Sequence, residues 1–96
     1  MAKFTVRIEL YGAAEASALY KLLDKKMAGR GFQTVIESTE GRRFELPTGE
    51  YSYEGEESGE EVREAAKEVA AEVGRTSAVL VTQSQVRWWS GLRTLD

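Results

Sequence analysis

Hydrophobic and polar residues alternate at the start of the chain and then change to a wider spacing. The apolar positions of the first stretch are Phe4, Val6, Ile8 and Leu10. A period of two is typical of a strand with one buried face and predicts a strand over residues 3–11. After Gly12 the apolar residues recur every three or four positions, which predicts a helix that ends at Gly29 and Gly31.

The middle of the chain has the composition of a hairpin. Residues 32–38 are rich in aromatic and β-branched side chains and predict a second strand, and a third strand is expected to start near Arg42 after a short turn. Pro47 cannot donate a ladder hydrogen bond, so the third strand should be bulged or interrupted there. Tyr51 and Tyr53 resume the alternation and are interpreted as an extension of that strand.

The second half contains one helix with clear ends and one short apolar strand. Ser58 followed by Glu61 is the pattern of a capping box, and the apolar stripe that follows predicts a helix ending at Gly74. Residues 77–82 are almost wholly apolar and predict a strand. Residues 83–96 show no clean period and are expected to form an irregular C-terminal segment.

The order of these elements predicts an α+β fold of ferredoxin-like βαββαβ topology. Such a chain forms an antiparallel four-stranded sheet with two helices on one face, and its opposite face would be uncovered. With 96 residues, 42% hydrophobic and 30% charged, residues 1–96 are expected to form a single domain.

The amino-acid composition excludes several kinds of catalytic and metal site. Because the chain has no Cys and no His, it lacks thiolate nucleophiles, the commonest general base and most zinc ligands. We therefore expect no metal and no cofactor. No apolar run is long enough to cross a membrane and no signal-peptide core precedes the first strand, so a cytoplasmic location without a membrane partner is expected. The net charge is -3, but the acidic residues are concentrated between Glu54 and Glu72.

The expected open face of the sheet is the first candidate site. It would present Arg7, Glu9 and Tyr11 from the first strand, joined by Arg43 and Glu45 from the third. Arginine and tyrosine on a flat sheet can hold phosphate and stack on bases of single-stranded RNA. The alternative is that these arginines and glutamates simply form cross-strand charge pairs on a solvated surface.

The C-terminal segment and the hairpin turn supply the other candidates. Trp88 and Trp89 are adjacent and must diverge, so one is expected to pack inward while the other can anchor a partner. Arg87 beside them could stack on a ring or a base, and Arg42 adds a cation near the turn.

The order of several short segments resembles the GhoS-like family, whose members are small ferredoxin-like endoribonuclease antitoxins of type V toxin-antitoxin systems. The resemblance extends over nearly the whole chain. It implies an RNA partner and metal-independent cleavage, and it assigns no catalytic residue. The segments that carry it are residues 4–10, residues 27–32, Gly41, Leu46-Pro47, Glu50-Tyr51, residues 80–82 and residues 89–92.

Two functions of different classes follow. The first is a GhoS-like RNA-interacting protein or endoribonuclease that holds phosphate with arginines and stacks a base on Tyr11 or a tryptophan. The second is a non-enzymatic interaction module that forms a homodimer through the open face or an edge strand. The second rests on a tryptophan anchor and on the expected exposure of Val35, Val79 and Val81.

Overall fold

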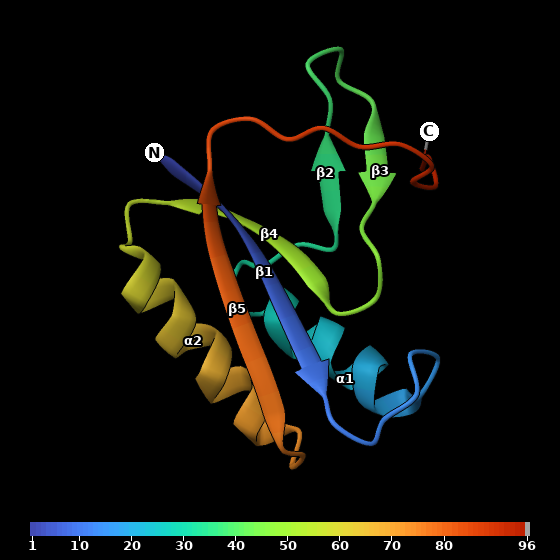
Figure 1. Ribbon diagram of the computed structural model, residues 1–96, viewed down its shortest axis with the longest axis vertical. Helices are drawn as coiled ribbons and strands as arrows, with labels where there is room; N and C mark the ends of the chain where they lie inside the picture. The colour runs from blue at the N-terminus through green and yellow to red at the C-terminus, as the bar shows by residue number, and fades with distance from the viewer. Residues whose placement is uncertain (96) are drawn as a thin grey trace.

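The computed structural model describes residues 1–95. The series of elements begins and ends with a strand, and three further strands lie between its two helices (Figure 1). None of the helices in this part of the chain is long and apolar enough to cross a membrane. In chain order the elements are β1 (Ala2–Leu10), α1 (Ala18–Ala28), β2 (Val35–Glu37), β3 (Arg43–Glu45), β4 (Glu50–Gly55), α2 (Gly59–Glu72) and β5 (Ser77–Ser84).

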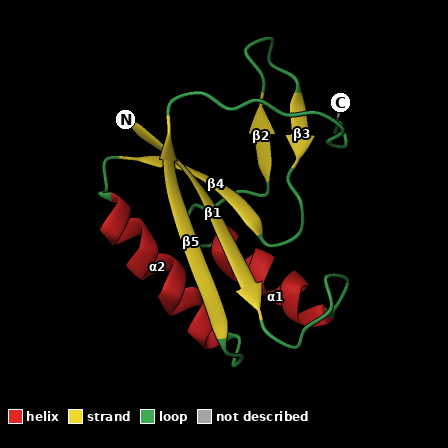
Figure 2. Cartoon of the chain, viewed as in Figure 1, coloured by secondary structure: helices red, strands yellow, loops and turns green. Residues whose placement is uncertain are grey.

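The strands form two antiparallel sheets. β1 lies in the centre of the first sheet, between β4 and β5, and β2 pairs with β3 in the second. Figure 2 shows both helices on the same side of the first sheet. The α+β class with two helices and antiparallel strands is therefore confirmed. The prediction of one four-stranded sheet is wrong, because the described strands divide three and two.

The interruption of the strand around Pro47 explains why the strands form two sheets. β3 ends before Pro47, and Gly49 adopts a φ of +84° that lets the backbone turn toward β1. The carbonyl oxygen of Gly49 then accepts a 2.8 Å hydrogen bond from the Ile8 N–H. As a result β4, which the sequence pattern marked only as an extension of the third strand, is the direct partner of β1. An isolated bridge between Gln33 and Ser52 connects the segment before β2 to β4, and the Ser52 hydroxyl donates a 2.7 Å hydrogen bond to the Val35 carbonyl of β2.

The core lies between the first sheet and the helices. The alternating apolar side chains of β1 are buried as predicted, and they pack against buried residues of both helices. Tyr51 of β4 is fully buried in this core and donates a 2.5 Å hydrogen bond to Oδ1 of Asp24 on α1. Burial, and secondly this hydrogen bond, raise the pKa of the Tyr51 phenol well above its usual value.

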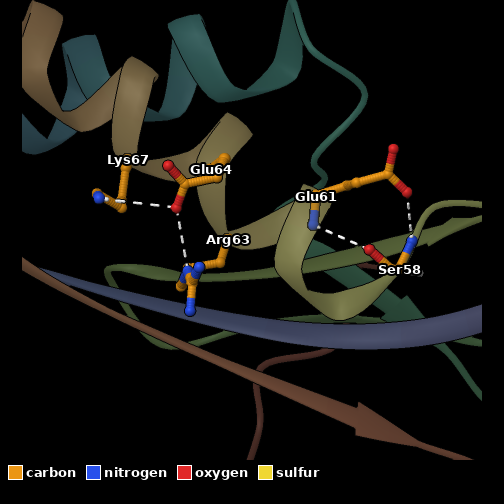
Figure 3. A network of polar contacts seen from close by, with 5 residues as sticks. All are labelled: Ser58, Glu61, Arg63, Glu64 and Lys67. Atoms are coloured by element: carbon orange, nitrogen blue, oxygen red, sulfur yellow. Dashed lines mark hydrogen bonds and ion pairs between the residues drawn. The ribbon is translucent and has the colours of Figure 1, made fainter.

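The start of α2 has the predicted capping box. The Ser58 hydroxyl accepts a hydrogen bond from the Glu61 N–H at 3.2 Å, and the Glu61 carboxylate accepts one from the Ser58 N–H at 2.9 Å (Figure 3). Both bonds satisfy backbone groups that a helix start leaves without partners. The helix therefore begins at a residue that the sequence identified.

Candidate nucleic-acid interface

The C-terminal segment, residues 85–95, crosses from the end of β5 to β3 (Figure 1). It ends in a short antiparallel pairing, in which the Glu45 N–H donates to the Arg93 carbonyl at 2.8 Å and the Leu95 N–H donates to the Arg43 carbonyl at 3.0 Å. We call the face of the first sheet opposite the helices the outer face. It was expected to be uncovered, but the C-terminal segment covers part of it.

Arg87 holds this segment against β1. Its Nε donates to the Thr5 hydroxyl at 2.9 Å, and a second guanidinium nitrogen donates to the Phe4 carbonyl at 2.8 Å. Partial burial lowers the pKa of the Arg87 guanidinium, and the charge of Glu54 acts in the opposite direction. The guanidinium predicted to stack on a base is thus engaged with the strand that lies beneath it.

The two tryptophans have different surroundings. Trp88 is 87% exposed. Trp89 is half-buried, and its ring meets the ring of Phe44 edge-on with centroids 5.4 Å apart. The guanidinium carbon of Arg42 lies 5.6 Å from the centre of the same Phe44 ring, within the range of a cation–π contact. The expectation that only one of the adjacent tryptophans packs inward is confirmed.

A groove of about 340 Å³ lies between the C-terminal segment and the outer face. We call it the tryptophan groove and define it by Pro47, Glu50, Arg87, Trp88 and Trp89, which all line it. Most of the wall is apolar or aromatic, and Glu50 contributes a carboxylate. Glu50 was not among the residues predicted for the site, although its position three residues after Pro47, where a strand pattern resumes, is a signal that the sequence contains.

Arg7 lies on the outer face next to Glu50. One of its guanidinium nitrogens is 3.9 Å from a Glu50 carboxylate oxygen, and the side chains are 60% and 25% exposed, respectively. A cross-strand charge pair was predicted for this face, but with a different partner. Arg43 and Glu45 belong to β3 in the second sheet, so they do not join Arg7 on the outer face as expected.

Tyr11 lies away from the tryptophan groove. It follows the C-terminal end of β1, where its N–H donates to the Thr76 carbonyl at 2.9 Å and its side chain is exposed. Arg87 contacts the same strand at Phe4 and Thr5, about 20 Å away at 3.3 Å per strand residue. Of the candidate residues, Arg7, Arg42, Arg43, Arg87, Trp88 and Trp89 lie in or near the C-terminal segment's crossing, whereas Tyr11 does not.

The apolar residues expected on the uncovered face are also placed differently. Val79 and Val81 pack against the hydrophobic core, and Val35 is half-buried. Because side chains alternate along a strand, it is Leu80 that points to the outer face, where it is 64% exposed.

The fold and groove together define a small α+β protein with an aromatic groove bordered by arginines on the outer side of its sheet. No protein-family model matches the sequence, and no curated protein matches it at a significant level.

Proposed function

We propose that this protein binds single-stranded RNA in the tryptophan groove and is a GhoS-like protein. The observation that carries the proposal is the 87% exposed Trp88 beside that groove. An exposed indole provides a stacking surface for a base of any identity, and such stacking contributes about 1–3 kcal/mol per base. The strand order β4-β1-β5 with both helices on one face supports a ferredoxin-like arrangement, as the GhoS-like resemblance implies.

Arginines on two sides of the groove would hold the phosphates. Arg7 borders it through Glu50 on the outer face. Arg42 lies against the Phe44 ring that Trp89 contacts, and the neighbouring Arg43 begins β3. A strand of RNA stacked on Trp88 can therefore reach a cation in either direction. The GhoS-like resemblance implies that the bound RNA is the messenger of a partner toxin.

We also propose that cleavage, as the resemblance implies, proceeds without a metal and uses Glu50 and Arg7. The Glu50 carboxylate would take the proton from a ribose 2′-hydroxyl, whose oxygen attacks the adjacent phosphorus. The bond from phosphorus to the 5′-oxygen breaks, and a water molecule protonates that oxygen while it takes the proton back from Glu50. The products are a 2′,3′-cyclic phosphate and a 5′-hydroxyl. Arg7, 3.9 Å from Glu50, would stabilise the charge on the pentavalent phosphorane.

The test combines binding and cleavage of a labelled mixed-sequence single-stranded RNA in the presence of EDTA. Trp88→Ala should weaken binding about fivefold or more, from the lost stacking. Arg7→Glu combined with Arg43→Glu should abolish binding, while Lys21→Glu combined with Lys25→Glu, an equal charge change on exposed residues of α1, should have a much smaller effect. Unchanged binding by the Trp88 and arginine variants would refute the site.

Glu50→Gln separates binding from cleavage. The variant keeps the size of the side chain but removes its ability to accept a proton, so RNA should still bind while EDTA-resistant cleavage is lost. Cleavage at the wild-type rate would exclude Glu50 as the base. Binding without cleavage in the wild-type protein would leave a binding protein without the nuclease activity.

A homodimer through the outer face is the second candidate. It is favoured by the exposure of Leu80, Val86 and Trp88, which are apolar and more than half exposed. Sedimentation velocity over a range of concentrations tests it, together with tryptophan emission. A monomer at all concentrations with emission unchanged on dilution would exclude this candidate.

A further inference from the structure

β5 is an edge strand without the usual protection. It pairs with β1 on one side, and no strand among residues 1–95 pairs with its other side. Edge strands normally carry a charge, a proline or a bulge that discourages pairing with another chain. All eight residues of Ser77–Ser84 are uncharged, and none is proline or glycine. In Figure 1 β5 lies at the left edge of the first sheet, and α2 runs along the same side of it.

The register shows which backbone groups face the free edge. The Tyr11 N–H donates to the Thr76 carbonyl, and the Ile8 N–H donates to β4 through Gly49, so odd-numbered residues of β1 bond toward β5. Their partners in the β5 register are even-numbered. Because hydrogen-bonded and non-hydrogen-bonded pairs alternate in an antiparallel ladder, the backbone groups of Val79, Val81 and Gln83 point away from β1.

A row of basic residues runs along α2 beside this edge. Arg63, Lys67 and Arg75 line a groove of about 350 Å³ together with Ser77 and Val79 of β5. They recur at intervals of four or eight residues and so lie on one side of the helix and its C-terminal turn. We call these three residues the basic stripe. The free edge of β5 therefore offers backbone hydrogen-bonding groups, and the basic stripe places positive charge beside them.

The negative charges of α2 are mostly directed elsewhere. Glu68 and Glu72 lie 3.2 Å and 3.1 Å from Arg30 and Lys26 in ion pairs that connect α2 to α1. Glu64 alone lies between Arg63 and Lys67, at 3.1 Å and 3.6 Å (Figure 3). Glu60, three residues before Arg63, lies near the stripe on the same helix face. The groove beside β5 is nevertheless lined by the three cations of the basic stripe and by no acidic residue among residues 1–95.

We propose that the free edge of β5 and the basic stripe bind an extended acidic peptide segment of a partner protein by β-strand addition. The added strand would bond to the backbone groups of Val79, Val81 and Gln83. Since its side chains alternate, one set would face the basic stripe and the other would lie beside Leu80 on the outer face. An alternation of acidic and apolar residues fits both sides.

Charge argues against a second copy of this chain as the occupant. A two-fold pairing of β5 with another β5 would bring the basic stripes of the two copies toward each other. Like charges facing each other in this way disfavour association. The stripe thus opposes self-pairing of an unprotected edge and favours a strand of opposite charge.

The test uses a fluorescein-labelled peptide of alternating Glu and Val, titrated with the full chain. Binding should weaken as salt is raised, and the same peptide with Lys in place of Glu should bind at least tenfold less tightly. Lys67→Glu should weaken binding of the Glu peptide similarly, whereas Lys21→Glu, the same charge change on α1, should not. Equal binding of both peptides would overturn the proposal.

Gln83→Pro tests whether the peptide forms backbone hydrogen bonds with the free edge of β5. Proline removes an N–H that points away from β1, so the fold and the β1 ladder stay intact while strand addition is blocked; Gln83→Ala is the matched control. In the wild type, hydrogen exchange at the Val79, Val81 and Gln83 amides should slow when the peptide binds. Peptide binding unaffected by Gln83→Pro, or amides that gain no protection, would refute strand addition. RNA binding by the same variants reports separately on the tryptophan groove.

Discussion

The first sheet with its helices and the second sheet with the C-terminal segment are built in different ways. The first is a closed core in which the four alternating apolar side chains of β1, from Phe4 to Leu10, are buried against both helices. The second has strands of three residues, a half-buried Phe44–Trp89 contact and an arginine that holds the crossing segment to β1. The stability of the fold is thus concentrated in the first sheet and its helices. The candidate RNA site lies where the second sheet and the C-terminal segment contact the first sheet.

Leu23→Ala should give the largest effect on stability. Leu23 of α1 is fully buried in the core, so truncation removes apolar contacts and leaves a cavity that costs about 2–5 kcal/mol. Urea denaturation followed by circular dichroism measures the loss. A loss below 1 kcal/mol would show that the core is not the main source of stability.

Tyr51→Phe should have the next largest effect, because it removes the hydrogen bond to Asp24. The loss is expected to be about 1–2 kcal/mol near neutral pH, since a polar partner is left without its hydrogen bond. The same urea experiment measures it, and a variant as stable as the wild type would show that this bond contributes nothing to folding.

Tyr51 also gives the core a dependence on alkaline pH. The pKa of its phenol is raised in the folded state, while the unfolded chain releases that proton near pH 10. The stabilisation is therefore complete below about pH 10 and is lost as pH rises further, by about 1.4 kcal/mol per pH unit. The difference between wild type and Tyr51→Phe should shrink above pH 10, and a constant difference would contradict this assignment.

The sequence predicts a region well where the structure depends on a local pattern of residues, and poorly where it depends on contacts between distant residues. Four alternating residues in β1 and the capping box of α2 are local signals, and the structure confirms both. The partner of β1 depended instead on how the chain turns at Pro47 and Gly49, which a strand pattern on either side cannot show. Because the chain turns there, β4 and not β3 pairs with β1, and Glu50 rather than Arg43 lies beside Arg7.

The candidate site was harder to predict for the same reason. The residue types alone indicated Arg87, Trp88 and Trp89 as candidates. Residues 83–96 show no regular spacing of apolar residues from which the course of the segment could be inferred. Their position comes from two hydrogen bonds to β1 and from pairing with β3, both between residues far apart in the sequence. Contacts of this kind have no local signature.

Arg87→Ala should have the smallest effect on global stability and a clear local one. The two hydrogen bonds of a partly exposed guanidinium are worth about 1 kcal/mol, so the urea midpoint should move little. Without them the segment loses its attachment to β1, and Trp89 should become more solvated. Tryptophan emission should therefore shift to longer wavelength, and RNA affinity should fall with it.

Arg87→Lys is the control, because lysine keeps the charge but cannot make the same pair of bonds to the Thr5 hydroxyl and the Phe4 carbonyl. If geometry is what matters, the lysine variant should show the same emission shift as the alanine variant. If lysine restores wild-type emission and RNA affinity, charge near Glu54 holds the segment instead. Emission unchanged in both variants would mean that the pairing with β3 and the Phe44–Trp89 contact suffice, and that the second region is more rigid than its few contacts with the first suggest.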